Sequence, residues 1–131
     1  ANTLYLIDYG LSVRWRDPIT RGHLPFRKHR FMGTARFGSV NTLAGIYPTR
    51  RDDLETLLYV LLYLHERLPW QGLKGPDRKE KIRLTKVGIT PELLCHSFPV
   101  GVVRFLRYVR KLAYDQTPDM GYLRSQLRSA L

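Results

Sequence analysis

Asp8 is the residue of this sequence whose position best suits it for chemistry. It follows the short apolar segment Thr3–Ile7, which has the composition of a β-strand, and it precedes Tyr9 and Gly10. A carboxylate at the end of a strand can hold Mg²⁺ against nucleotide phosphates, and Gly permits the sharp turn behind it. An Asp-x-Gly sequence is also common in ordinary turns. The pattern alone leaves both interpretations open.

The charge balance predicts an attraction to anions. Lys and Arg number 22 against 11 Asp and Glu, so the 131-residue chain carries a net charge of +11. A charge of this size draws anionic partners over a distance set by salt screening. Phosphopeptides, acidic proteins and nucleic acids all qualify. Arg104, Arg107 and Lys111 lie on one side of a predicted helix, but no RNA- or DNA-binding signature accompanies them. Nucleic acid is therefore a minor option.

Other kinds of site receive little support from the sequence. The four histidines are scattered, with no Cys or carboxylate at metal-ligand spacing, which makes a zinc site improbable. A single cysteine, Cys95, excludes an internal disulfide and is expected to be a small buried residue. The longest apolar stretch, Leu57–Leu64, is far shorter than the roughly 20 residues that a membrane span needs. We expect no membrane association and a cytoplasmic or nuclear location.

The remaining pattern predicts a single, mainly α-helical domain. After the strand at Thr3–Ile7, residues 11–38 lose all periodicity and read as a long basic loop. A helix is expected from near Arg51 through Glu66, because Asp52 and Asp53 favour the positive end of a helix dipole. Its middle is apolar on every side, which predicts a central helix buried by neighbours on several faces.

Three or four further helices are expected after the central one. A charged amphipathic helix is expected over Asp77–Lys86, and a short one at Pro91 behind the N-cap candidate Thr90. Val102, Val103, Leu106 and Val109 follow at helical spacing. The last helix is expected to begin at Thr117-Pro118-Asp119 and to carry Leu123, Leu127 and Leu131.

Five spaced motifs, in order, resemble the casein kinase 1 group of Ser/Thr protein kinases. They are Asp8-Tyr9-Gly10, Gly33-Thr34-Ala35-Arg36-Phe37, Ser39-Val40-Asn41-Thr42, Arg50-Arg51-Asp52-Asp53-Leu54-Glu55 and Leu68-Pro69-Trp70-Gln71-Gly72-Leu73-Lys74. The Ser-x-Asn sequence stands where most kinases have Ala-Pro-Glu. The resemblance continues to Asp119, and it implies that residues 1–131 are the C-terminal lobe of a kinase domain: a short strand, a long activation segment and a helical bundle around a buried central helix.

The resemblance also implies roles for individual residues. Asp8 would be a Mg²⁺ ligand, Gly10 the hinge of the activation segment, and Thr34 the hydroxyl that orients the catalytic loop. Asp53 would cap the backbone amides of that loop, although in this chain a plain structural role for Asp53 is the stronger expectation. Members of the group prefer acidic or already phosphorylated substrates, and the cations at the matching anion-binding positions are Arg36, Lys74 and Arg78.

Most of the machinery for phosphoryl transfer is missing from the sequence. Transfer needs a Gly-rich loop over the phosphates, a Lys with its Glu partner, a catalytic-loop Asp and an Asn for the second metal. None of these precedes Asp8 or follows it. Mg²⁺ and ATP are therefore expected as cofactors of a complete kinase but not of this chain alone.

Three interpretations remain open. The chain is part of a kinase that transfers the ATP γ-phosphate to acidic or primed proteins, and is inactive alone. Otherwise it is a non-catalytic lobe that binds phosphorylated or acidic proteins. Separately, a missing N-terminal lobe could join in trans. The third and most remote interpretation is a nucleic-acid-associated module.

Overall fold

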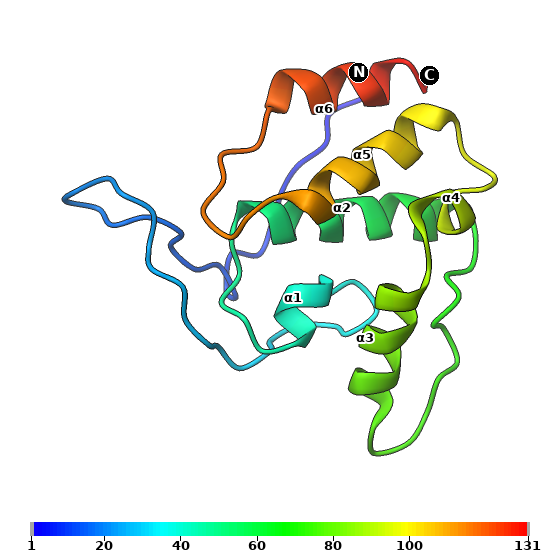
Figure 1. Ribbon diagram of the computed structural model, residues 1–131, viewed down its shortest axis with the longest axis horizontal. Coiled ribbons are helices and arrows are strands. Elements are labelled where there is room, and N and C mark those ends of the chain that lie inside the picture. The colour runs from blue at the N-terminus through cyan, green and yellow to red at the C-terminus, as the bar shows by residue number, and fades with distance from the viewer. Residues whose placement is uncertain (1, 131) are drawn as a thin grey trace.

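The computed structural model describes residues 2–130 and is mainly helical (Figure 1). The described part of the chain contains six helices. They are α1 (Val40–Leu43), α2 (Arg50–His65), α3 (Arg78–Gly88), α4 (Pro91–Leu94), α5 (Val100–Lys111) and α6 (Met120–Arg128). In Figure 1, α6 lies above α5 and α5 above α2, while α1 and α3 lie below α2. Direct contacts join α6 to α5, α5 to α2, α2 to α1 and α1 to α3.

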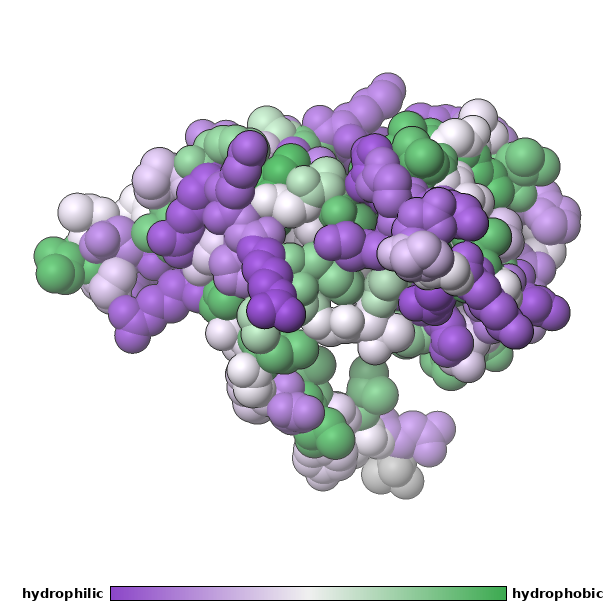
Figure 2. All heavy atoms as spheres, turned by 90° about the horizontal axis from the view of Figure 1, so that it is seen from below, coloured by the Kyte–Doolittle hydropathy of each residue, from purple (hydrophilic) through white to green (hydrophobic). Residues whose placement is uncertain are grey.

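The predicted strand at Thr3–Ile7 is wrong. Residues 2–9 have no regular secondary structure, and the Leu4 side chain is 97% exposed. The segment projects from the body as an arm with exposed apolar residues (Figure 2). A strand needs a neighbour to pair its N–H and C=O groups. The two isolated β-bridges within residues 2–130 join Arg16 to His23 and Lys28 to Ile46, so nothing pairs with this arm.

The long loop predicted over residues 11–38 is confirmed as a segment without helices. In Figure 1 it extends far from the helices before it returns to α1. Near its tip, Asp17 accepts hydrogen bonds from the Ile19 and Thr20 amides at 2.7 and 2.8 Å. The Tyr47 hydroxyl donates to the Arg14 carbonyl oxygen at 2.7 Å, and this bond ties the base of the loop to the segment before α2.

Asp52 fixes the junction between α1 and α2. Its buried carboxylate accepts hydrogen bonds from the Thr49 amide at 2.8 Å and from the Ser39 hydroxyl at 2.6 Å. Ser39 in turn caps α1 by accepting a hydrogen bond from the Thr42 amide. One carboxylate therefore joins the N-cap of α1 to the first turn of α2, which begins at Arg50, one residue before the predicted start.

α2 is central, but the prediction that it is buried on several faces is wrong for one face. Leu58, Tyr59 and Leu62 are buried against the other helices. Leu57, Leu61 and Leu64 form a row on the opposite face and stay exposed, Leu64 by 76%. α2 therefore has apolar side chains on a face that the described part of the chain leaves exposed.

The later helices begin where local chemistry favours them. The Thr90 hydroxyl accepts a hydrogen bond from the Leu93 amide, and Pro91 occupies the first position of α4, as predicted. Asp119 caps α6 through the Tyr122 amide at 2.9 Å. α5 buries Val102, Phe105, Leu106 and Val109 in the common core. No helix within residues 2–130 has the length and apolarity that a membrane crossing requires.

Candidate functional site

Asp8 lies at the base of the N-terminal arm. Its backbone has φ of 61°, and its carboxylate accepts a hydrogen bond from the Gly10 amide at 3.2 Å. Asp8, and not Gly10, therefore has the left-handed backbone conformation. Asp adopts this conformation more readily than most residues do. Asp8 is exposed and lines an open hollow of about 350 Å³, together with Thr49, Arg50 and Asp53.

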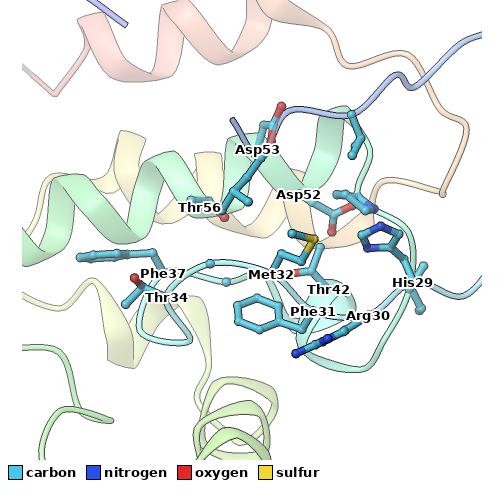
Figure 3. Close-up of a pocket in the computed structure, with 16 residues that line it drawn as sticks. His29, Arg30, Phe31, Met32, Thr34, Phe37, Thr42, Asp52, Asp53 and Thr56 are labelled. Carbon is cyan, nitrogen blue, oxygen red and sulfur yellow. The ribbon is translucent and has the colours of Figure 1, made fainter. Parts of the chain in front are cut away.

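Thr34 lines a different space from Asp8. It is exposed and lines a cavity of about 290 Å³ whose wall includes Asp52, Asp53 and Thr56 (Figure 3). The Thr34 carbonyl oxygen accepts hydrogen bonds from the Phe37 and Gly38 amides at 3.0 and 3.2 Å. These two bonds close a turn over residues 34–38, which we call the 34–38 turn.

Asp53 borders both spaces, the hollow of Asp8 and the cavity of Thr34. Its carboxylate is open to solvent on one side and crowded by protein on the other. Partial desolvation raises the pKa of Asp53, and the neighbouring Asp52 carboxylate adds to this effect. Within residues 2–130 the Asp53 side chain accepts no hydrogen bond, and the N-terminal turn of α2 is capped by Asp52 instead. Asp53 is therefore not an N-cap residue.

The surroundings of Asp8 agree in part with a magnesium site. Mg²⁺ is usually bound by one or two carboxylates, with phosphate and water oxygens completing the octahedron. Asp8 and Asp53 provide two carboxylates at one hollow. Residues 2–130 contain no cluster of three or more His, Cys, Asp or Glu side chains that could hold a metal. A magnesium ion here would therefore depend on nucleotide phosphates for most of its ligands.

Arg36 lies beside two aromatic rings, which also contact each other. Its guanidinium carbon lies 5.0 Å from the centroid of the Tyr63 ring and 5.7 Å from that of Phe37. The Arg36 Nε atom is buried and donates to no acceptor among residues 2–130. The Arg36 carbonyl oxygen accepts a hydrogen bond from the Trp70 indole at 2.8 Å. The backbone of Arg36 is therefore fixed, and its side chain is partly exposed.

The structure does not join Lys74 and Arg78 to Arg36. Arg78 lies at the first position of α3, and its Nε donates to the Leu73 carbonyl oxygen at 3.0 Å. Lys74 is exposed. Across the described residues, no hydrogen bond or cavity contains Arg36 together with either of them. The link is indirect, through Trp70, which begins the segment that leads to Lys74.

The sequence motifs contact one another in space. Ser39 binds Asp52, and the Val40 amide donates to the Glu55 carboxylate at 3.1 Å. These contacts join the Ser39–Thr42 motif to the Arg50–Glu55 motif. The bond between Trp70 and the Arg36 carbonyl oxygen joins the Leu68–Lys74 motif to the Gly33–Phe37 motif. Four of the five motifs therefore form two contacting pairs around the start of α2 and the 34–38 turn.

Lys86 is a prominent site residue that the sequence analysis missed. Its side chain is fully buried, and Nζ donates to the carbonyl oxygens of Ala35, Arg36 and Gly38 at 3.0, 3.0 and 2.6 Å. Burial lowers the pKa of Lys86 to about 7, against a smaller opposing effect of the Glu55 carboxylate. The signal was present in the sequence, because Lys86 follows the buried Ile82 by one helical turn on the apolar face of α3.

Glu55, Tyr59 and Arg110 form a buried network beside Lys86. The Tyr59 hydroxyl donates to the Glu55 carboxylate, and Arg110 donates to the Tyr59 oxygen at 3.1 Å and to the Lys86 carbonyl oxygen at 3.0 Å. Burial raises the pKa of Glu55 and also that of Tyr59. This network connects α2, α3 and α5 behind the 34–38 turn.

Cys95 is buried, as predicted. Burial raises the pKa of its thiol to about 11, so the thiolate that a nucleophile needs is scarce at neutral pH.

A comparison of the whole chain with models of known protein families finds no match. Function is therefore inferred from the residue pattern and from the geometry of the site.

Proposed function

We propose that this chain is the C-terminal-lobe portion of a Ser/Thr protein kinase of the casein kinase 1 type. The complete enzyme would transfer the γ-phosphate of ATP to acidic or already phosphorylated proteins. The observation that carries the proposal is the position of Asp53. It lies in the wall of both the hollow of Asp8 and the cavity of Thr34, which supports placing the residues named by the resemblance around one site.

Each residue has a role that suits its surroundings. Asp8 is exposed and offers a carboxylate to a magnesium ion, which would neutralise charge on the phosphates of bound ATP. Thr34 presents its hydroxyl beside the cavity where a substrate segment would lie. Asp53 is free of partners among residues 2–130 and accessible, which suits a carboxylate that accepts backbone amides from a catalytic loop.

Arg36 provides the anion-binding side of the proposal. Its position against Tyr63 and Phe37 limits the motion of the guanidinium, so less conformational entropy is lost when an anion binds. Lys74 and Arg78 add positive charge on the segment that follows Trp70. A phosphate or carboxylate on a substrate would be bound by Arg36 and attracted by the other two.

The 131-residue chain alone is proposed to be inactive. Positioning of ATP requires a Gly-rich loop, a Lys and a catalytic-loop Asp, and the sequence contains none of these motifs. An N-terminal lobe of the same polypeptide would supply them.

A second candidate function is a non-catalytic module that binds phosphorylated or acidic proteins. The observation that favours it is the half-buried Arg36 beside the Tyr63 and Phe37 rings, on a chain of net charge +11. This function needs only the anion-binding side of the site. It differs from the first candidate in requiring neither ATP nor a second lobe.

Both candidates predict that a phosphopeptide binds at Arg36 and is attracted by Arg78. We expect the double variant Arg36→Ala/Arg78→Ala to weaken binding of a phosphothreonine peptide at least about tenfold, since a charge-assisted hydrogen bond contributes about 1.5–3 kcal/mol. Isothermal titration calorimetry measures the effect, with the unphosphorylated peptide as the reference ligand.

The matched control is Arg104→Ala/Arg124→Ala, which removes two exposed charges from α5 and α6. It should lower affinity only slightly, through the loss of long-range attraction. Equal affinity for the native chain and the Arg36→Ala/Arg78→Ala variant would rule out the anion site.

A further inference from the structure

We propose that Lys86 is a positioning residue that holds the 34–38 turn in the conformation in which Arg36 can bind an anion. The inference rests on the proposed function, because it assigns Lys86 to the same anion site. It goes further in naming a residue on a different element, α3, that determines whether the site is formed.

The hydrogen bonds of Lys86 provide the main support. Three carbonyl oxygens of one short turn, those of Ala35, Arg36 and Gly38, accept from a single Nζ atom. A carbonyl oxygen only accepts, so three such bonds require all three hydrogens of the ammonium form. A cation that gathers three carbonyl oxygens in this way fixes the path of the backbone between them.

Ala35 and Phe37 pack against the core, but few other hydrogen bonds hold the turn. Its own amide bonds run from Phe37 and Gly38 to the Thr34 carbonyl oxygen. Trp70 donates to the Arg36 carbonyl oxygen, the same atom that Lys86 binds. Without Lys86, three carbonyl oxygens would lose a donor, and two of these bonds are buried. A turn in that state gains by moving toward water, and Arg36 moves with it.

Burial of the Lys86 ammonium group costs free energy, because the group loses its contact with water. The titratable groups that face it are Glu55 and Tyr59 from α2 and Arg110 from α5, and Glu55 is the one whose negative charge attracts it. The rings of Tyr59 and Trp70 lie 4.5 and 4.7 Å from Nζ. An apolar residue in this space would avoid the desolvation of a charge. A residue kept for stability alone would not need to be a lysine.

The experiment compares affinity with stability in three proteins. Lys86→Met keeps the length of the side chain without donors or charge, and Lys86→Gln keeps two N–H donors without charge. At pH 6.5, where the ammonium form is populated, we expect phosphopeptide affinity to fall at least tenfold in Lys86→Met and less in Lys86→Gln. The free energy of unfolding should not follow this order, because Met suits the buried space better than Gln.

Hydrogen exchange reports on the turn directly. The Phe37 and Gly38 amides should exchange at least tenfold faster in Lys86→Met than in the native chain. The Leu106 and Val109 amides of α5 should keep their rates. The proposal would be overturned if phosphopeptide affinity fell in proportion to the free energy of unfolding across the variants. Unchanged exchange rates of the Phe37 and Gly38 amides would also overturn it.

Two further outcomes are distinguishable. If the native chain fails to bind the phosphopeptide, the proposed anion site is wrong. The exchange rates of the Phe37 and Gly38 amides then test by themselves whether Lys86 positions the turn. If both variants fail to fold, nuclear magnetic resonance of the native chain tests whether Lys86 Nζ makes the three hydrogen bonds. The Lys86 Nζ protons should exchange slowly enough at pH 6.5 to give an ammonium signal. Rapid exchange of these protons would contradict the three hydrogen bonds.

Discussion

Lys86 combines complete burial with a positive charge, and this makes the stability of the protein depend on pH. Its pKa is lowered to about 7 in the folded chain, mainly by desolvation, from the ordinary value of 10.5. Below pH 7 both the folded and the unfolded chain carry the proton. Between the two pKa values the unfolded chain binds a proton that the folded chain does not, so stability rises with pH in that window.

We therefore predict a pH-dependent difference between the native chain and Lys86→Met. Urea unfolding at pH 7, 8 and 9 should show the free energy of unfolding of the native chain rising relative to the variant, by at most about 1.4 kcal/mol per pH unit. The subtraction removes the contribution of the four histidines, which both proteins share. A difference that stays constant from pH 7 to 9 would mean that the carbonyl oxygens keep the pKa of Lys86 near 10.5.

Residue type along the sequence indicated part of this site and missed the rest. Asp8, Thr34 and Asp53 were identified from their motifs, and in the structure Asp53 lies in the wall of both the hollow of Asp8 and the cavity of Thr34. Lys86 was assigned only to a charged helix, because a lysine on an apolar face is usually a solvated side chain with a buried stem. Its partners are backbone carbonyl oxygens about 50 residues away, and no side-chain pattern marks those atoms.

At the scale of elements, the contact between α5 and α6 depends on Gly101. A Cβ atom at this position would lie 2.1 Å from the Gln126 carbonyl oxygen of α6. Backbone cannot move away as a flexible side chain does, so a larger residue must push the two helices apart. The absence of a side chain at Gly101 thus sets the distance between α5 and α6.

Gly101→Ala should destabilise the protein by about 1–3 kcal/mol, the usual range for overpacking. The matched control is Gly88→Ala at the end of α3, where a Cβ atom would meet nothing within 4 Å. This control should be neutral or stabilising, because Ala favours the helix over Gly by about 1 kcal/mol. Chemical denaturation of both variants checks the prediction, and equal stability of the two would contradict it.

The sequence predicted where the helices lie along the chain better than it predicted which of their faces are buried. α4 begins directly after the predicted N-cap Thr90, and α6 begins at Met120, directly after the predicted start at Thr117-Pro118-Asp119. The prediction of a strand at Thr3–Ile7 was wrong. Residues with high strand propensity form a strand only when a second strand pairs with them, and residues 2–130 contain no such partner. The exposed row on α2 could not be predicted either, since an all-round apolar helix does not say which neighbours cover it.

At the scale of the whole molecule, two features indicate what the proposed kinase lobe would meet. The net charge of +11 attracts anionic substrates and should make their binding weaken as salt increases. The arm of residues 2–9 and the exposed Leu57, Leu61 and Leu64 leave apolar surface uncovered. An N-terminal lobe is the partner that the proposed function requires.

The most direct test of the kinase proposal is the coding sequence immediately upstream of Ala1. We predict a Gly-rich loop, a Lys with a Glu partner, and a His-Arg-Asp catalytic loop followed by Asn, all in the same reading frame. These are the groups that phosphoryl transfer requires and that the 131 residues lack. A stop codon directly before Ala1, or an upstream domain with none of these motifs, would contradict the proposal that this chain is part of a kinase.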